Sequence, residues 1–98
     1  MIRHTVVFSL KHPPGSREEK EFLKAAALLA NIPGVGNFES LRQVSRSNNY
    51  DFGLSMEFGS QELYDAYSGN QAHALFIQQY WTPFVKEFLE IDYQPLYD

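Results

Sequence analysis

The chain has 98 residues, of which eight are Lys or Arg and twelve are Asp or Glu, so its formal net charge is −4 at pH 7. This length predicts one domain spanning residues 1–98, and a hydrophobic fraction of 44% supplies enough apolar area for a core. The acidic balance, without a cluster of Lys and Arg, argues against nucleic acid as a partner. The absence of Cys excludes disulfides and thiolate metal sites.

Hydropathy also argues against a membrane partner. No apolar run reaches the roughly 18 residues that a spanning helix needs. The first ten residues alternate in polarity and do not form the continuous apolar stretch of an export signal. We therefore expect a cytoplasmic protein.

The first third of the chain predicts a strand followed by a helix. Residues 2–10 alternate, with one apolar side that consists of Ile2, His4, Val6, Phe8 and Leu10. A helix is expected from Arg17 to Asn31, because Ser16 and Glu19 match a capping box in which each side chain satisfies a free backbone N–H of the other residue. The inward stripe of this helix is expected to be Phe22, Leu23, Ala26, Leu29 and Ala30.

The remainder predicts two strands, a pair of helices and a last strand. Residues 37–45 are expected to be extended, and clear alternation returns at 51–58. Ser60 is a suitable N-cap for a short helix through Tyr67. A longer helix is expected from Gln71 with a kink or restart at Pro83, and residues 90–97 form the final extended segment. The stripe of that helix is spaced by four residues and comprises Ala72, Phe76, Tyr80, Phe84 and Phe88.

The resulting order is strand, helix, strand, strand, helix, strand, which is typical of an α+β, ferredoxin-like βαββαβ fold. One layer of helices would cover the apolar face of the sheet and leave the other face open. A second copy of the chain, with the two sheets face to face, would cover it, so we expect a homodimer through sheet faces and edges. The open face is expected to carry Thr5, Val7, Leu41, Ser55 and Leu96.

Several segments together resemble the stress-responsive dimeric α/β-barrel (Dabb) family over essentially the whole chain. They are the first strand Ile-Arg-His-Thr-Val-Val-Phe-Ser-Leu-Lys, the Ile-Pro-Gly-Val turn at residues 32–35, Tyr50-Asp51, and Phe-Gly-Ser at 58–60 followed by Tyr67 and His73. The resemblance implies a ferredoxin-like protomer that dimerises into a β-barrel with the helices outside. Members of the family include polyketide cyclases and ring-forming stress proteins. The resemblance therefore implies one fold but does not single out one activity.

The resemblance singles out Tyr67 and His73 as catalytic candidates, because the Tyr-x5-His spacing matches a phenolic hydrogen-bond donor and an imidazole base of the cyclases. An imidazole can remove a proton flanked by carbonyl groups, and a phenol can stabilise the enolate that forms. Family members often carry His-Pro where this chain has Asn70-Gln71, which removes one imidazole and a rigid turn. The alternative is that Tyr67 and His73 pack together at the junction of two helices.

The resemblance also implies that His4 and Asp92 belong to a ligand site, with His4 facing a cavity between sheet and helices and Asp92 orienting an imidazole. Their structural alternatives are a buried His with satisfied hydrogen bonds and a solvated strand carboxylate. The cavity wall would come from apolar side chains that are otherwise ordinary core residues and that favour a small apolar or phenolic ligand. These side chains are Val6, Phe8, Phe22, Leu54, Met56, Leu63, Phe76, Phe84 and Phe88.

Three functions agree with these observations. The first is a homodimeric ligand-binding protein with cofactor-free cyclase or lyase chemistry, in which His73 is the base and Tyr67 the oxyanion donor, supported by Asp92 or His4. The second is a non-catalytic stress-response oligomer, and the third is a cofactor-independent monooxygenase acting on phenols. The sequence contains no phosphate-binding loop, no nucleophile elbow and no metal-ligand spacing, so no cofactor and no metal are expected.

Overall fold

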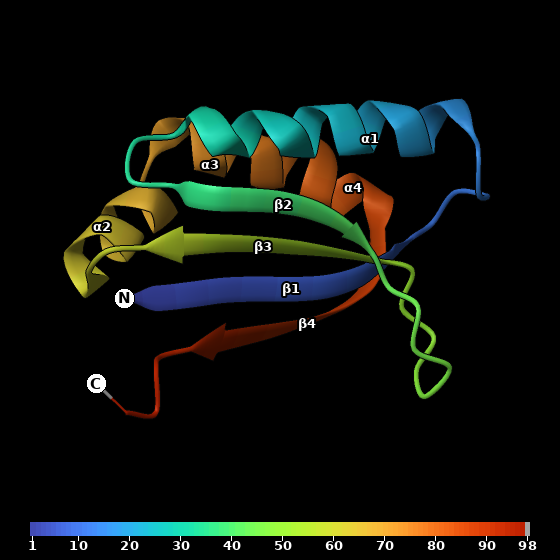
Figure 1. Ribbon diagram of the computed structural model, residues 1–98. Helices are drawn as coiled ribbons and strands as arrows, with labels where there is room; N and C mark the ends of the chain where they lie inside the picture. The colour runs from blue at the N-terminus through green and yellow to red at the C-terminus, as the bar shows by residue number, and fades with distance from the viewer. Residues whose placement is uncertain (98) are drawn as a thin grey trace.

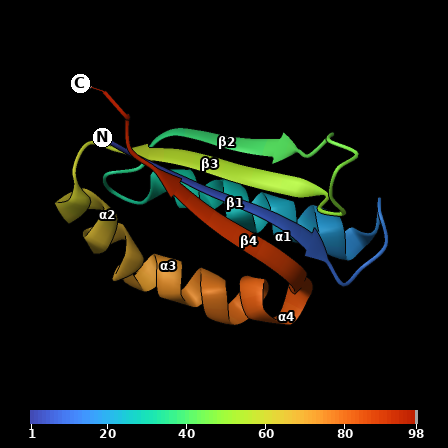
Figure 2. The same cartoon turned by 90° about the horizontal axis from the view of Figure 1, so that it is seen from below.

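The computed structural model describes residues 1–97, which form one four-stranded sheet with helices on one of its faces (Figures 1 and 2). The strands stand in the order β2-β3-β1-β4, and every neighbouring pair is antiparallel. The predicted ferredoxin-like α+β fold is therefore confirmed. In chain order the elements are β1 (Ile2–Leu10), α1 (Arg17–Ala27), the 3-10 helix η1 (Leu28–Asn31), β2 (Gly36–Arg42), β3 (Phe52–Phe58), α2 (Gln61–Ser68), α3 (Gln71–Phe76), the π-helix η2 (Ile77–Trp81), α4 (Thr82–Phe84) and β4 (Val85–Tyr93).

Local sequence signals set the first helix. The Ser16 hydroxyl accepts a hydrogen bond from the Glu19 N–H at 3.2 Å, as the capping pattern predicts. The Ser16 N–H donates instead to the carbonyl of Pro13 at 3.1 Å, so the turn before the helix takes the place expected for the Glu19 side chain. Phe22 and Ala26 are fully buried against the sheet.

The end of the second helical run differs from the prediction. The helix does not continue to Phe88, because α4 ends at Phe84 and β4 begins at Val85. Pro83 has no N–H with which to continue the helical ladder, and the chain before it widens into the π-helix η2. Val85 then adopts extended angles and pairs with Leu10, so the last strand starts five residues earlier than expected and ends at Tyr93 instead of Tyr97.

The core lies between the inner face of the sheet and the helices. Its four largest completely buried side chains are Phe8, Phe22, Met56 and Phe58. Within residues 1–97, helices cover only this face, so the side chains that alternate outward on β1 and β4 have no layer of these residues above them (Figure 1). Within residues 1–97, no helix combines the length and hydropathy that crossing a membrane requires.

Candidate functional site

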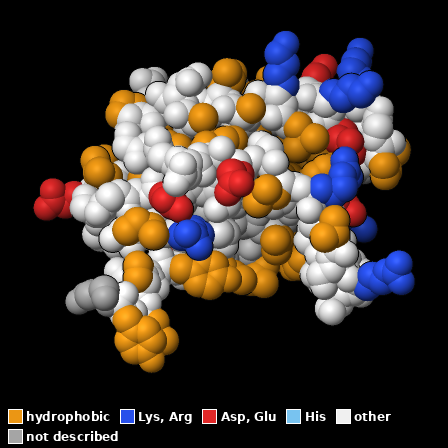
Figure 3. Space-filling view, viewed as in Figure 1, with side chains coloured by type: hydrophobic (Ala, Val, Ile, Leu, Met, Phe, Trp, Pro, Cys, Tyr) orange, Lys and Arg blue, Asp and Glu red, His pale blue; other side chains and the backbone are white. Residues whose placement is uncertain are grey.

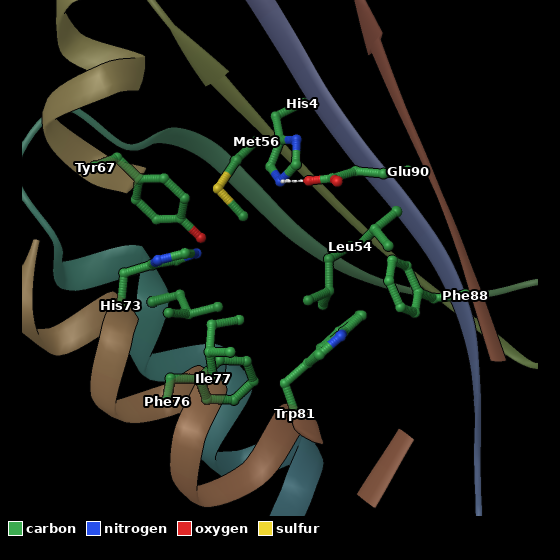
Figure 4. A pocket seen from close by; sticks show the side chains of 12 residues that line it. His4, Leu54, Met56, Tyr67, His73, Phe76, Ile77, Trp81, Phe88 and Glu90 are labelled. Carbon is green, nitrogen blue, oxygen red and sulfur yellow. Dashed lines mark ion pairs between the residues drawn. The ribbon is translucent and has the colours of Figure 1, made fainter. Parts of the chain in front are cut away.

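A cavity of about 290 Å³ lies between the inner face of the sheet and the run of helices from α2 to η2 (Figure 4). This volume is at the lower end of the range for small-molecule sites. The side chains of Phe88 and Glu90 on β4 are more than half exposed, so the cavity reaches solvent beside this strand. The lining residues are His4, Val6, Leu54, Met56, Phe88 and Glu90 from the strands, and Leu29, Tyr67, His73, Phe76, Ile77 and Trp81 from the helices.

His4 is held at the polar end of the cavity by two neighbours. It is paired with Asp92 across β1 and β4, and its Nδ1 lies 2.6 Å from Asp92 Oδ1. The hydroxyl of Tyr64, from α2, donates to Asp92 Oδ2 at 2.7 Å and lies 2.9 Å from the same Nδ1. These contacts fix the ring of His4 and leave its Nε2 directed towards Glu90, whose Oε1 is 3.6 Å away (Figure 4).

Tyr67 and His73 form the other part of the polar end. Tyr67 is 2% exposed on the last turn of α2, and its ring centroid lies 4.6 Å from that of His73 in the first turn of α3. Asn70 caps α3 by accepting from the Ala72 N–H at 2.8 Å, which fixes the turn between the two helices. Figure 4 shows the Tyr67 hydroxyl and the His73 ring pointing towards each other.

Burial sets the protonation of this pair. Loss of solvent lowers the pKa of His73 below its ordinary value of 6.5, although a hydrogen bond to the backbone of Ser68 partly opposes this change. Burial also raises the pKa of the Tyr67 phenol, with a smaller contribution from the negative charge of Glu90. At neutral pH the imidazole is therefore uncharged and available as a base, while the phenol keeps its proton and can donate it to an acceptor.

The opposite end of the cavity is apolar and aromatic. The π-helix η2 contributes Ile77 and Trp81, and the sheet contributes Leu54 and Phe88. The Trp81 ring meets Phe88 edge to face, with ring centroids 5.5 Å apart. The site as a whole is suited to a small molecule that has one polar group and an apolar body.

The structure separates the predicted site residues into two groups. The cavity brings together Tyr67, His73, His4, Val6, Leu54, Met56, Phe76 and Phe88. The other predicted residues do not line the cavity. Phe8 and Phe22 are buried in the core, and Phe84 contacts Phe22 and Tyr80. Leu63 is 43% exposed on α2, and Asp92 orients His4 from behind the cavity lining.

Sequence reasoning missed Tyr64 and Glu90. Tyr64 lies three residues before Tyr67 and so shares its helix face, a spacing that could have suggested it. Glu90 was not recognised because the last strand was predicted to start at this residue. In the structure β4 begins earlier, and the alternation of Phe88, Glu90 and Asp92 places all three side chains on the inner face of the sheet. Among residues 1–97, no cluster of three or more His, Asp or Glu side chains is placed to hold a metal ion.

The family model described as the stress responsive A/B barrel domain, Dabb, matches residues 2–95. The chain belongs to the Dabb family. A Dabb protein from Mesorhizobium loti, described as having a ferredoxin-like fold, is 52% identical with a TM-score of 0.94, and the match covers 97% of this chain and 96% of that one. No curated protein matches the chain significantly.

Two more distant structures share the fold with this Dabb chain. A protein of unknown function from Thermobifida fusca, described as dimeric and ferredoxin-like, is 19% identical with a TM-score of 0.77 over 94% of this chain and 88% of that one. A hydroxynitrile lyase from Passiflora edulis is 12% identical with a TM-score of 0.83 over 99% and 96%. At these identities the likeness establishes the fold and no more.

The lowered pKa of His73 predicts a pH-dependent contribution to stability. Between the folded-state pKa and the ordinary value of 6.5, the unfolded chain binds a proton that the folded protein does not bind. The free energy of unfolding should therefore decrease as the pH falls through this interval, and the variant His73→Gln should lack this part of the decrease.

Urea titrations of both proteins at several values between about pH 5 and pH 7.5 measure this effect. The difference in free energy of unfolding between the wild type and His73→Gln, in favour of the wild type, should be larger at the upper end of the pH range than at the lower end. An advantage that stays constant, or that grows as the pH falls, would contradict the assignment of a buried and uncharged imidazole.

Proposed function

We propose that this Dabb protein is a homodimer whose cavity binds a small carbonyl compound and promotes cofactor-free acid–base chemistry on it. The observation that carries the proposal is the contact between an uncharged His73 and a protonated Tyr67 at one end of an otherwise apolar cavity. Titratable groups with shifted pKa values that meet in a cavity are typical of acid–base sites.

The proposed step is proton removal from a carbon next to the carbonyl group. His73 takes the proton, and the electron pair of the broken C–H bond moves to form an enolate whose negative charge lies on the carbonyl oxygen. The Tyr67 hydroxyl donates a hydrogen bond to that oxygen, where the charge develops. His73 then returns the proton to carbon. In a cyclase-like reaction the enolate carbon instead attacks a second carbonyl carbon, the C=O π bond breaks to give an alkoxide, and His73 gives its proton to that alkoxide.

His4 supports this chemistry in a different way. Its Nδ1 lies 2.6 Å from Asp92 Oδ1, and this contact orients the ring so that its Nε2 faces Glu90 on the cavity side at 3.6 Å. It can therefore shape the polar end of the cavity, where the carbonyl group of the ligand meets Tyr67 and His73, without taking part in the proton transfer. The Passiflora protein is named as a lyase, but its identity to this chain is 12%, so the proposal rests on the side chains and not on that name.

Exchange of α-protons for deuterium tests the chemistry. Phenylacetone is an uncharged aromatic ketone, and ¹H NMR in D₂O follows the loss of its CH₂ signal. The wild-type protein should accelerate the exchange, His73→Gln should lose the acceleration, and Tyr67→Phe should lower the rate by about 100-fold because one oxyanion donor is removed.

Tyr80→Phe is the matched control, because it also removes a phenolic hydroxyl but Tyr80 does not line the cavity. This variant should exchange the ketone at the wild-type rate. Equal rates for Tyr67→Phe and the wild type would contradict the role of Tyr67. No acceleration by the wild type, together with oxygen consumption on adding a quinol, would favour the monooxygenase alternative.

The outer face of the sheet supports the homodimer. Gly53 is paired with Leu41 on one side and with Val7 on the other, and Val7 is paired with Leu89, so these residues form an apolar row across all four strands. Leu41 and Leu89 are 45% and 49% exposed, and Figure 3 shows hydrophobic side chains gathered over β4. A contiguous apolar surface of this kind is typical of an interface, and a second sheet can cover it.

A charge placed within this face should separate the protomers. In Ile91→Lys, the side chain next to the apolar row becomes charged, and we expect light scattering after gel filtration to change from twice the monomer mass to the monomer mass at micromolar concentration. Leu28→Lys changes an exposed leucine on the helical side of the molecule and should remain dimeric. A dimeric Ile91→Lys protein, or a monomeric wild type, would contradict the proposed interface.

A further inference from the structure

Glu90 places a carboxylate at the mouth of the cavity. It is paired with Val6 across β1 and β4, and its side chain therefore lies on the inner face of the sheet beside that of His4. The side chain is 56% exposed, and its Oε1 is 3.6 Å from His4 Nε2 (Figure 4). A ligand that enters beside β4 passes this carboxylate before it reaches Tyr67 and His73.

The charges around the polar end do not balance. Glu90 and Asp92 are two carboxylates that face a single imidazole, His4, so the three groups together are negative whether or not His4 carries a proton. His73 is uncharged at neutral pH because burial lowers its pKa. Among the described residues that line the cavity there is no Lys or Arg to pair with a bound anion.

We propose that Glu90 makes the cavity selective against anions, so that its ligand is an uncharged carbonyl compound with an apolar body and not a carboxylate. This inference rests on the proposed function, because it concerns the same cavity. A carboxylate ligand would lose its hydration on entering the apolar space and would stand close to Glu90 without a cation beside it. An uncharged ketone, aldehyde or amide of the same shape would lose no hydration of a charge and would not be repelled by Glu90.

The imidazole of His4 does not remove this selectivity. Its two nitrogen atoms already face the two carboxylates, Nδ1 at 2.6 Å from Asp92 and Nε2 at 3.6 Å from Glu90. An anionic ligand would have to displace Glu90 from His4 to gain a charged partner. An uncharged carbonyl oxygen can instead accept the hydrogen bond of Tyr67 and leave the carboxylates in place.

Phenylacetamide and phenylacetate test the proposal, since they are nearly equal in shape and differ in charge at pH 7. The chain has one Trp, and Trp81 lines the apolar end, so its single indole N–H signal in a ¹H–¹⁵N spectrum reports occupancy of the cavity. In the wild type, we expect the dissociation constant of phenylacetate to be at least about tenfold larger than that of phenylacetamide.

The variant Glu90→Gln should tighten phenylacetate binding by about three- to tenfold and leave phenylacetamide binding within about twofold of the wild type. Glu62→Gln is the matched control, because it removes the same charge from an exposed position on α2 away from the cavity lining. The preference for the amide should be unchanged in this control.

Each of the other results overturns the proposal in a recognisable way. Equal binding of the two probes to the wild type, or an unchanged preference in Glu90→Gln, would overturn charge selection and leave the ligand cavity intact. The same gain in phenylacetate binding in Glu62→Gln would assign the effect to net charge and not to Glu90. A Trp81 signal that neither probe moves at any concentration would overturn the binding cavity itself, and the selectivity with it.

Discussion

The register between β1 and β4 determines which chemistry each face of the sheet carries. His4 stands opposite Asp92, Val6 opposite Glu90 and Phe8 opposite Phe88, so the inner face of β4 presents two carboxylates and an aromatic ring. Leu89 and Ile91 consequently point outward. A slip of one residue would turn the carboxylates to the outer face and bring the aliphatic side chains into the cavity. The site and the proposed interface therefore depend on the same pairing.

A sheet covered by helices on only one side has two different surfaces to use. On the inner side, the second helical run stands far enough from β1 and β3 to leave about 290 Å³ next to His4 and Met56, although protein interiors are normally packed without gaps larger than a water molecule. The π-helix η2 helps to form this space by contributing Ile77 and Trp81 to its wall. On the outer side, the apolar row through Val7 remains available for a second sheet.

Most of the fold could be predicted from the sequence because its signals are local. Alternation in residues 2–10 and 51–58 and the caps at Ser16 and Ser60 each specify an element without reference to the rest of the chain. The start of the last strand was predicted too far along the chain, because Phe84 and Phe88 are four residues apart and this spacing also suits a helix. Pairing of Val85 with Leu10, a contact across most of the chain, decides in favour of the strand.

The candidate site was less accessible to sequence reasoning. Tyr67, His73 and His4 are titratable or phenolic groups in recognisable positions, and the resemblance to the Dabb family singled them out. Phe8 and Phe76 both face inward, but of the two only Phe76 lines the cavity. The sequence cannot separate them, because the difference depends on the local distance between helix and sheet. The role of Tyr64 in holding Asp92 depends on a contact between α2 and β4 that no local pattern encodes.

The central claim is that the space between β1, α2 and η2 is a ligand site with its polar end at Tyr67 and His73. A crystal structure of the protein soaked with phenylacetone tests it most directly. The account predicts the ketone inside the cavity, with its carbonyl oxygen within hydrogen-bond distance of the Tyr67 hydroxyl and its phenyl ring between Trp81 and Leu54. A cavity filled by closure of Trp81 and Phe88, with the ketone bound on the outer surface between α1 and α3, would contradict it.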